Sequence, residues 1–468
     1  MTRRHFLRTL GMASAAGLVP RLTSTQTHTK AKPNILFLFT DDQRFNTLGA
    51  LNNPAIKTPN MDRLVRNGTV FTHAHIMGSM SGAVCMPSRA MLMTGRTLFH
   101  IQGKGEGIPE EHTMLPELLR ANGYTTFGIG KWHNGPAAFN RAFASGAKIF
   151  FGGMSDHLHL PVSHYDPTGA YPKEERYPAE GFSSEVFSDA AIAFIEGQAG
   201  KGPFFAYVSY TAPHDPRMAP KAYADMYPPD AIELPENFMP EHPFDNGELR
   251  IRDEKLAPFP RTPDVVRQHI AAYYAMITHL DAQIGRVLDA LDATGQADNT
   301  LIVFAGDNGL AVGQHGLLGK QSLYDHSVRV PLIFCGPGIP QGQVSDALCY
   351  LLDIFPTLCD RLGLAIPASV DGKSLYPLFA DLKGCVRDSL FFAYCDVQRG
   401  VRTGEWKLLK YNVAGTKTTQ MFNIKEDPWE LRNLAGVSEY AQHEASTTAL
   451  LRRWMADVDD PCTPAEWL

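Results

Sequence analysis

The 468-residue chain is expected to form an α/β fold, in which a large mixed and mostly parallel β-sheet is flanked by helices. Three observations predict this fold. Short apolar runs without polar alternation recur before about residue 365, as in parallel strands that are buried on both faces. Segments with apolar residues at helical spacing separate these runs. After about residue 365 the segments become shorter and alternate with turn residues, which predicts a small antiparallel sheet.

The individual elements follow from these patterns. The expected strands of the main sheet are Ile35–Phe39, Thr125–Ile129, Phe204–Tyr210, Leu301–Ala305 and Pro331–Phe334. The expected helices are Pro59–Asn67, Met114–Asn122, Ser183–Glu196, Thr262–Thr294 and Asp353–Leu362. The C-terminal sheet is expected from Leu390–Tyr394, Gly400–Thr403, Trp406–Tyr411 and Gln420–Asn423, followed by a helix near 440–457. Regions 134–182 and 212–260 show little periodicity, which is typical of long functional loops.

The first 30 residues have the features of an export signal and linker. Thr2–Leu7 contains paired arginines, and the apolar stretch Thr9–Val19 is too short to span a bilayer. Paired arginines before Phe-Leu are typical of a bacterial twin-arginine signal, although an ordinary secretory signal shares the basic start. Either signal predicts a periplasmic or secreted protein. We therefore expect a signal and linker (1–30), a catalytic domain (31–364) and a C-terminal subdomain of α+β type (365–468).

Composition excludes several classes of function. The formal charge of -6 gives the protein no overall positive field, so nucleic acid is not an expected partner. The chain beyond the signal contains no run of 18 apolar residues, so it is not expected to be embedded in a membrane. The seven cysteines lack zinc-type spacing. Because an odd number cannot all pair, at least one is expected to be buried, free or chemically altered, and Cys85 is the candidate.

Acidic side chains directly follow two of the expected strands. The first strand ends in Thr40-Asp41-Asp42, and a later one ends in Gly306-Asp307-Asn308-Gly309. Ligands of open α/β sheets bind beyond the carboxyl ends of the strands, where three carboxylates would repel each other without a cation. All-oxygen ligand sets suit Ca²⁺ or Mg²⁺. Each pair alone is more often a helix N-cap or a turn, but both pairs at strand ends predict a divalent metal site.

Basic side chains follow two further strands. They are Lys131, His133 and His214. A single histidine in an exported protein is more often structural than catalytic, but cations beside a metal site are what an anion site requires. His315 and Lys320 follow Asp307 closely enough to join the cluster, whereas His326 and Arg329 are expected to be structural.

A nucleophile is expected at Cys85. This residue begins the run Cys85-Met86-Pro87-Ser88-Arg89-Ala90-Met91-Leu92-Met93-Thr94-Gly95-Arg96. Pro87 suits the first turn of a helix and Gly95 suits its end. Cys85 would then lie just before a helix N-terminus, where free N–H groups and the helix dipole favour an anion.

The twelve-residue run resembles the Cys-x-Pro-Ser-Arg-x-x-x-x-Thr-Gly-Arg element of the type I formylglycine-dependent sulfatases, an alkaline phosphatase-like family. Further matches in the family's order are Pro33–Asp42, Gly130–His133, Pro213–Pro216, Gly306–Gly309, His315–Pro331 and Asp427–Leu434. The resemblance covers nearly the whole mature chain and implies an alkaline phosphatase-like fold with sulfuric ester hydrolase activity. Asn134 stands where many relatives have leucine, which affects no catalytic role.

The resemblance also implies a modified nucleophile and a metal. A maturation enzyme would oxidise Cys85 to formylglycine, whose hydrated aldehyde carries two hydroxyls on one carbon. One hydroxyl would attack the sulfur of the ester, and deprotonation of the other would let the hemiacetal collapse and expel sulfate. A serine lacks this exit. The implied metal ligands, most often for Ca²⁺ and less often for Mg²⁺, are Asp41, Asp42, Asp307, Asn308 and residue 85.

The remaining motif positions receive roles from the same resemblance. Asp307 would activate the attacking hydroxyl. Arg89 and Lys131 would orient formylglycine and neutralise charge, and His133 would assist its second hydroxyl. The pair that would bind the sulfate and protonate the departing alcohol is His214 and Lys320.

Two other functions fit parts of the pattern. A phosphate or phosphonate ester hydrolase of the same superfamily can share the motif, but a dianionic phosphate favours additional cations or a second metal, and the sequence offers no further His and Asp cluster. A non-catalytic glycan-binding homologue would keep the fold, but the intact set of nucleophile, ligands and acids argues against it.

The expected substrate is a sulfated saccharide. Export and the resemblance to bacterial polysaccharide sulfatases favour it. Several aromatic and histidine residues of the irregular regions suit stacking on a sugar, although ordinary loop packing explains them too. They are Trp132, Phe150, Phe151, His157, His159, His164, Tyr165 and Tyr171.

Overall fold

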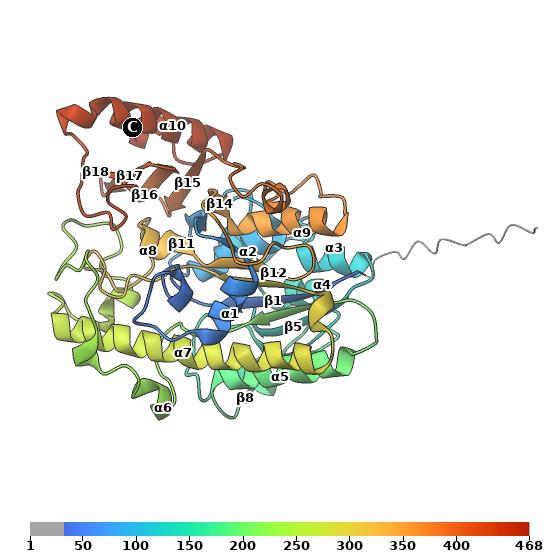
Figure 1. Cartoon of the computed structure of the whole chain (residues 1–468). Coiled ribbons are helices and arrows are strands. Elements are labelled where there is room, and N and C mark those ends of the chain that lie inside the picture. Colours follow the sequence, from blue (N-terminus) through green and yellow to red (C-terminus); the bar gives the residue numbers. More distant parts are fainter. Residues whose placement is uncertain (1–31, 468) are drawn as a thin grey trace, which may run out of the picture. The chain divides into compact units, whose positions relative to one another are not determined.

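The computed structural model describes residues 32–467, so the expected export signal at 1–30 lies outside the described residues. An eight-stranded sheet forms the centre of this part, in the order β13-β2-β12-β10-β1-β9-β5-β6 (Figure 1). Its strands are β1 (Asn34–Thr40), β2 (Gly68–Phe71), β5 (Thr125–Lys131), β6 (Ser145–Phe150), β9 (Phe204–Ser209), β10 (Thr300–Gly306), β12 (Leu332–Cys335) and β13 (Gln343–Ser345).

The sheet is mixed and mostly parallel, as the sequence predicts. β10, β1, β9, β5 and β6 run parallel, and β12 is antiparallel to both β10 and β2. Continuous burial indicates that a strand lies inside a sheet but not its direction, so the reversal at β12 had no signal in the apolar pattern. The strand predicted up to Tyr210 ends at Ser209, and the other predicted strands of this sheet lie within two residues of their observed bounds.

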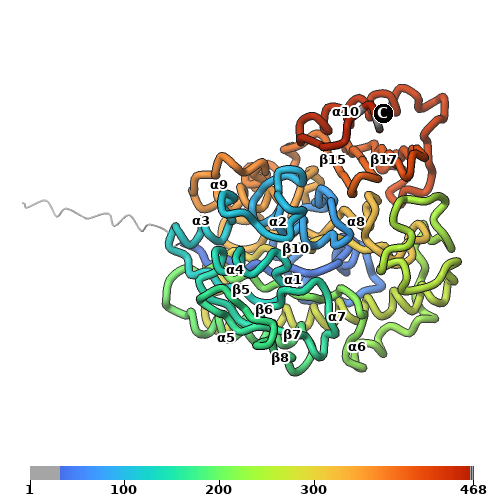
Figure 2. Tube along the Cα trace, turned by 180° about the vertical axis from the view of Figure 1, so that it is seen from behind, coloured from blue at the N-terminus to red at the C-terminus, as the bar shows by residue number. Residues whose placement is uncertain are grey.

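Two layers of helices cover the two faces of the sheet (Figures 1 and 2). Side chains of β1 alternate between them: Ile35, Phe37 and Phe39 pack in one core, and Leu36 and Leu38 pack in the other. The first core contains residues of α2 (Cys85–Thr94), α3 (Leu115–Ala121), α4 (Pro136–Ala142) and α9 (Ile354–Leu362). The second contains residues of α1 (Pro59–Asn67), α5 (Ser183–Gln198) and α7 (Pro263–Ala293).

Helix α2 carries the motif that begins at Cys85. All ten of its residues are buried. It ends where Gly95 adopts a left-handed conformation (φ 67°) and donates its N–H to Met91 O, because glycine tolerates positive φ without a Cβ clash. The prediction placed Cys85 just before the helix, but Cys85 is its first residue because Val84 already has helical backbone angles.

The C-terminal part contains the expected antiparallel sheet. Its strands are β15 (Ser389–Tyr394), β16 (Gln398–Thr403), β17 (Trp406–Val413) and β18 (Thr416–Asn423). The short strand β4 (Gly78–Ser79), which precedes α2, adds to this sheet parallel to β15. Helix α10 (Ala441–Asp457) packs on β16 and β17, as Figures 1 and 2 both show. The C-terminal sheet is thereby attached directly to the segment that leads into Cys85.

Several short elements were not predicted. Region 134–182 contributes α4, the edge strand β6 and the two-stranded sheet of β7 (Pro161–Val162) and β8 (Tyr177–Pro178). A second small sheet is formed by β3 (Ala74–His75), β11 (Arg329–Val330) and β14 (Cys349–Tyr350). Region 212–260 is irregular apart from α6 (Lys221–Ala224) and two short 3-10 turns, as expected.

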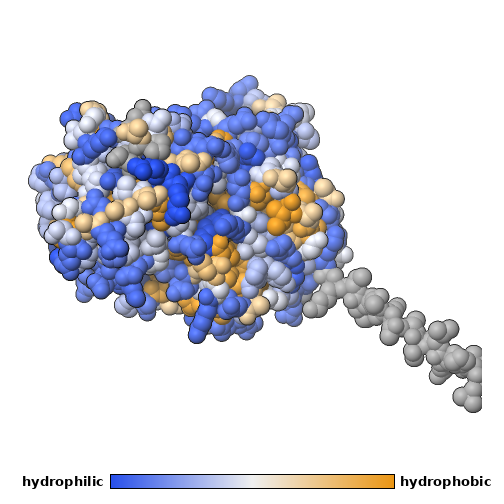
Figure 3. Space-filling model, turned by 90° about the horizontal axis from the view of Figure 1, so that it is seen from above, coloured by the Kyte–Doolittle hydropathy of each residue, from blue (hydrophilic) through white to orange (hydrophobic). Residues whose placement is uncertain are grey.

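The surface agrees with the composition of the chain. Among the described residues, none of the helices has both the length and the apolar character needed to cross a membrane. On the face seen from above, hydrophilic residues surround separate apolar patches (Figure 3).

Candidate active site

The strand register brings the predicted residues to one edge of the sheet. Thr40 pairs with Gly306, so Asp41 and Asp307 leave β1 and β10 side by side. On the other side of β1, β9 and β5 end level with it, which places Lys131 at the same edge. Asp42 and Asn308, which are 266 positions apart in the chain, therefore contact one another here. This is the carboxyl edge where open α/β sheets bind ligands.

Asp41, Asp42, Asp307 and Asn308 form a buried cluster at this edge, each with at most 1% of its surface exposed. Asp42 has a left-handed backbone (φ 63°), and its N–H donates to Asp307 Oδ1 at 3.0 Å. Three oxygens of the cluster are buried without a hydrogen-bond donor: Asp41 Oδ1, Asp42 Oδ2 and Asn308 Oδ1. Buried oxygens seldom stay unpartnered, and together with the crowded carboxylates they form a donor set that fits a hard divalent cation.

Burial and crowding affect the proton affinity of one carboxylate of the cluster, Asp307. Burial, with the neighbouring Asp41 carboxylate, raises the pKa of Asp307 to about 7. Sulfur or oxygen atoms of Asp41, Cys85 and Asp307 all lie within 4.8 Å of one another, as do ligand atoms of Asp41, Asp42 and His214. A cation bound among these atoms would favour the charged forms of the acids.

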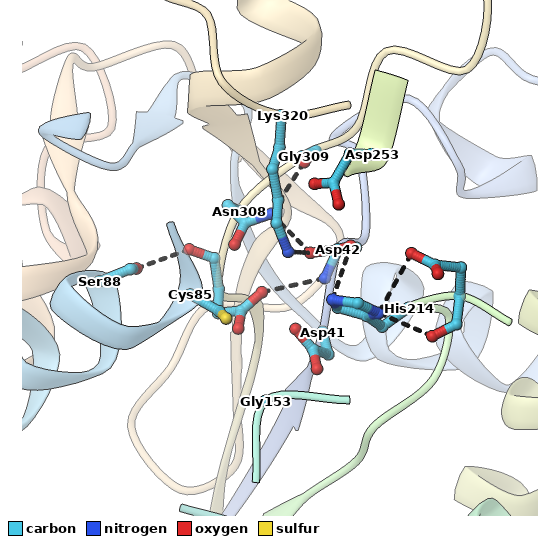
Figure 4. A network of polar contacts seen from close by, with 12 residues as sticks. Asp41, Asp42, Cys85, Ser88, Gly153, His214, Asp253, Asn308, Gly309 and Lys320 are labelled. Atoms are coloured by element: carbon cyan, nitrogen blue, oxygen red, sulfur yellow. Dashed lines mark hydrogen bonds and ion pairs between the residues drawn. The ribbon is translucent and has the colours of Figure 1, made fainter. Parts of the chain in front are cut away.

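Two lysines bind the acidic cluster directly. Lys131 Nζ donates to Asp41 Oδ2 at 2.5 Å and to Gly153 O at 2.6 Å, and lies 3.4 Å from Cys85 Sγ. Lys320 Nζ donates to Asp42 Oδ1 at 2.5 Å. Burial opposes the charge of Lys320, but Asp42 raises the pKa of Lys320 well above its ordinary value. Lys320 is thus a fixed positive charge beside Asp42 (Figure 4).

Arg89, one turn along α2, ties three strand ends together. Its Nε and Nη2 atoms lie 3.0 and 2.8 Å from Asp307 Oδ2. Its Nη1 donates to Ser209 Oγ at 2.6 Å and to Lys131 O at 3.1 Å. Because Arg89 is fully buried, these contacts fix the beginning of α2 against the acidic cluster of Asp41, Asp42, Asp307 and Asn308.

The two histidines are held as neutral rings. His133 Nδ1 lies 3.3 Å from Cys85 Sγ, and burial with the nearby Lys131 charge lowers the pKa of His133 to about 2. Burial also lowers the pKa of His214 to about 4, against the opposing effect of Asp42. His214 Nδ1 donates to Asp215 O at 2.8 Å, which leaves Nε2 directed toward Asp42 Oδ2 at 3.6 Å. Figure 4 shows His214 and Lys320 converging on the acidic cluster from two sides.

The structure thus brings together all ten predicted site residues: Asp41, Asp42, Cys85, Arg89, Lys131, His133, His214, Asp307, Asn308 and Lys320. His315 does not join them, contrary to the expectation from its spacing. Its ring stacks on Tyr324 and its Nε2 pairs with Glu430 O at 3.1 Å, because Gly316 turns the chain before Lys320 returns to the site.

Most of the aromatic residues expected to stack on a sugar are core residues instead. Trp132, Phe150 and Tyr171 are 1–4% exposed, and Trp132 packs edge-on against Phe139 and Phe143. His157 is buried and pairs with Ser183 Oγ. The packing interpretation is therefore right for these residues, while His159 and His164 lie on the surface. Fully buried rings have no free face for a ligand.

Asn134 and several unpredicted residues support the site. Asn134 Nδ2 donates to Met86 O at 2.9 Å and to Gly105 O at 2.6 Å, so the polar residue holds the first turn of α2. Ser88 donates to Asp307 O at 2.6 Å, and Tyr273 on α7 donates to Asp42 O at 2.5 Å. A tyrosine inside an apolar helix face was the only sequence signal for Tyr273, since its partner lies 231 residues away.

Comparison with known proteins identifies the family of this arrangement. A family model described as "Sulfatase" matches residues 33–364. A second model, described as "N-sulphoglucosamine sulphohydrolase, C-terminal", matches residues 313–457. The first match includes every residue of the site just described.

Individual relatives extend over most of the chain. An "Ulvan-active sulfatase" of Formosa agariphila is 30% identical, and the alignment covers 94% of this chain and 84% of the relative. An "N-acetylglucosamine-6-O-sulfatase" of Bacteroides thetaiotaomicron is 26% identical, with 97% of this chain and 90% of the relative covered. Among solved structures, a protein in complex with its substrate D-glucosamine-2-N,6-O-disulfate has a similar fold. Its TM-score is 0.77 at 23% identity, over 93% of this chain and 99% of that one.

Proposed function

Since the chain belongs to the sulfatase family and is a sulfuric ester hydrolase, we propose that it removes sulfate from a sulfated saccharide. The reaction would use a formylglycine made from Cys85 and one divalent metal ion. The observation that carries this proposal is the position of Cys85, 3.3 Å from His133 and 3.4 Å from Lys131, beside a buried set of oxygen ligands.

The metal would be held by Asp41, Asp42, Asp307, Asn308 and an oxygen of residue 85. Every donor is an oxygen, which suits Ca²⁺ or Mg²⁺, and the resemblance to the sulfatase family favours Ca²⁺. When bound, the ion supplies positive charge that stabilises the negative charge developing on the sulfate oxygens. The three unpartnered oxygens of Asp41, Asp42 and Asn308 support this assignment.

The nucleophile would be a hydroxyl of hydrated formylglycine, and the Cys85 Sγ atom marks the place of its oxygens. Asp307, whose Oδ2 is held by Arg89, would take the proton of the attacking hydroxyl. Lys131 would stabilise the oxygen that stays on residue 85. His133 would assist the second hydroxyl, since its Nδ1 lies next to residue 85.

His214 and Lys320 would act on the other end of the substrate. Both side chains contact Asp42, His214 through Nε2 and Lys320 through Nζ, whereas Arg89 contacts Asp307. In this position Lys320 can donate hydrogen bonds to the sulfate oxygens. His214 would donate from Nε2 in its protonated form, which the negative charge of a bound sulfate ester favours, and could then pass a proton to the departing alcohol. Leaving-group protonation matters most for sugar alcohols, which are poor leaving groups.

The saccharide part of the proposal rests on the relatives. Two of them are described as acting on ulvan or on N-acetylglucosamine 6-O-sulfate, and the fold is shared with a protein that binds a disulfated glucosamine. The test is desulfation of a panel of defined sulfated sugars, with 4-nitrophenyl sulfate and 4-nitrophenyl phosphate as comparison substrates. Cleavage confined to small aryl sulfates would refute the saccharide proposal, and much faster phosphate cleavage would refute the preference for sulfate.

The modification has an independent test. We expect mass spectrometry of the peptide that contains residue 85 to give the mass of formylglycine in active protein from a host with a maturation enzyme. An unmodified thiol in fully active protein would refute the mechanism. Among the described cysteines, Cys85 is the one that lies beside the acidic cluster, so no other cysteine could take this role.

Location and domain limits remain proposals from the sequence. We propose that residues 1–30 direct export to the periplasm or the medium, and that 31–364 and 365–468 are the catalytic domain and its C-terminal subdomain. Cell fractionation of wild-type protein and of a variant with both paired arginines replaced by lysine tests export. Retention of the variant in the cytoplasm is the expected result.

A further inference from the structure

The two side chains that would act on the sulfate and the leaving group, His214 and Lys320, both lie in loops. His214 follows β9, and Lys320 lies between β10 and α8 (Asp325–Val328). A loop side chain needs support, because a displacement of about 1 Å can cost ~100-fold in rate. We propose that the tripeptide Arg252-Asp253-Glu254 is a positioning clamp, which holds His214 and Lys320 at the positions where they can act on the reacting ester. This inference rests on the proposed function.

Arg252 supports His214 through Asp215. Its Nη1 and Nη2 atoms donate to the two carboxylate oxygens of Asp215, the second at 2.9 Å. Asp215 in turn receives the His214 Nδ1 proton on its backbone oxygen at 2.8 Å, and its Oδ1 lies 3.4 Å from the same nitrogen. A proton held on Nδ1 leaves Nε2 of His214 facing the site. The Asp215 side chain is 8% exposed, so it depends on Arg252 for its counter-charge.

Glu254 supports the loop that ends at Lys320. Its carboxylate accepts the N–H groups of Leu318 at 3.0 Å and of Gly319 at 2.8 Å. Arg261 completes the arrangement by donating to Glu254 Oε2 at 2.5 Å and to Gly316 O at 2.5 Å. A Cβ at Gly319 would come within 2.9 Å of Glu254 Oε1, so the close approach requires glycine there. The backbone directly before Lys320 is thereby fixed to Glu254.

Asp253 connects the two halves. Its Oδ1 lies 2.9 Å from Arg252 Nη2, and its Oδ2 accepts a hydrogen bond from Gln321 Nε2 at 2.7 Å. Gln321 receives the N–H of Lys320 on its Oε1 at 3.0 Å and donates to Gly82 O at 2.9 Å. Gly82 lies three residues before Cys85, so the same contacts reach the segment of the nucleophile. Figure 4 shows Asp253 beside Lys320 on the side away from Cys85.

Local geometry explains how one tripeptide reaches both loops. Asp253–Leu256 forms a 3-10 turn, and Arg252 is the residue that caps it. Successive side chains of a 3-10 turn point about 120° apart, so the three neighbours can bind Asp215, Gln321 and the 318–319 backbone. One short segment, the clamp, therefore sets the distance between His214 and Lys320, although the two residues lie in separate loops.

The test compares Arg252→Lys and Glu254→Gln with wild-type enzyme and with the control Arg250→Lys, an exposed arginine of the same loop. Lysine has one nitrogen and cannot bind both carboxylate oxygens of Asp215 in the bidentate way of Arg252, and glutamine has a single, uncharged acceptor oxygen in place of the two of Glu254. Rates are measured on 4-nitrophenyl sulfate and on phenyl sulfate, whose leaving group is more basic. Dissociation constants for inorganic sulfate are measured by calorimetry, and melting temperatures are recorded for all proteins.

We expect both variants to lose kcat/KM by about tenfold to ~100-fold, to lose more on phenyl sulfate than on the nitrophenyl ester, and to bind sulfate several-fold more weakly. A merely structural role would lower both rates by one common factor and leave sulfate affinity unchanged, which would overturn the inference. Wild-type activity in both variants would also overturn it. If Glu254→Gln fails to fold, Arg252→Lys, whose side chain is 42% exposed, carries the test. Wild-type protein that neither cleaves sulfate esters nor binds sulfate would instead refute the proposed function, and the clamp with it.

Discussion

Replacement of Arg89 by lysine is expected to test how strongly the site depends on one buried guanidinium. Arg89 makes two contacts with Asp307 Oδ2 and donates to Ser209 Oγ and Lys131 O. A lysine has one nitrogen and satisfies at most part of this set. Loss of two hydrogen bonds that involve a charged group costs about 1.5–3 kcal/mol each, so we expect Arg89→Lys to lower the free energy of unfolding by about 4 kcal/mol.

The measurement is equilibrium urea denaturation of wild-type and variant protein under identical metal concentrations. The matched control is Arg63→Lys, because Arg63 also makes two contacts with carboxylate oxygens, those of Asp289 and Asp292, but its side chain is 35% exposed. Exposed ion pairs contribute about 0–1 kcal/mol, so the control should lose less than ~1 kcal/mol. Equal losses in the two variants would refute the argument from burial. We also expect kcat of Arg89→Lys to fall by at least ~100-fold, since the reacting groups lose their orientation.

Three further predictions address the nucleophile, the metal and the effect of pH. Cys85→Ser should release about one equivalent of phenol from an aryl sulfate in a rapid-mixing assay, after which the reaction should stop, because serine lacks the second hydroxyl that expels sulfate. Steady multiple turnover would contradict this prediction. Removal of divalent ions with a chelator should abolish activity and lower the melting temperature, because Asp41, Asp42 and Asp307 then repel each other. Addition of Ca²⁺ should restore both. Unchanged activity and melting temperature after chelation would show that the enzyme has no functional metal. Burial raises the pKa of Asp281 from 3.8 to about 6, so the folded protein retains a proton there that the unfolded chain releases. This contribution to stability is complete below pH 4 and is lost as the pH rises through 6, in total on the order of 3 kcal/mol. The side chain in Asp281→Asn stays neutral at every pH. The unfolding free energy of the variant minus that of wild type should therefore rise by about 3 kcal/mol between pH 4 and pH 7. If this difference does not change with pH, the pKa of Asp281 is not raised.

The core of the fold was predictable because it depends on local patterns. Uninterrupted apolar runs identified the strands of the main sheet, and helical spacing identified α7 and its neighbours to within a few residues. The polar residues that end β1 and β10 could be assigned to one site because carboxyl ends of parallel strands meet at one edge. The same reasoning correctly placed Lys131 and His214.

The parts that could not be predicted depend on contacts between distant segments. β4 has two residues and forms only because β15, more than 300 residues later, provides its partner. His315 and Lys320 are five residues apart, yet the turn at Gly316 sends them to different environments. The tripeptide Arg252-Asp253-Glu254 has no periodicity, and all of its partners outside the turn are set by tertiary structure.

The complete burial of α2 constrains the order of events in the life of the protein. Cys85 is 2% exposed in the folded chain, and the helix that it begins is covered on all sides. If Cys85 is oxidised as proposed, the oxidising enzyme must therefore reach this segment before α2 is buried in the folded chain. If the twin-arginine route exports the protein already folded, oxidation has to be finished in the cytoplasm. Export and activation would then be coupled through folding, and unmodified protein would leave the cell without a means of later repair.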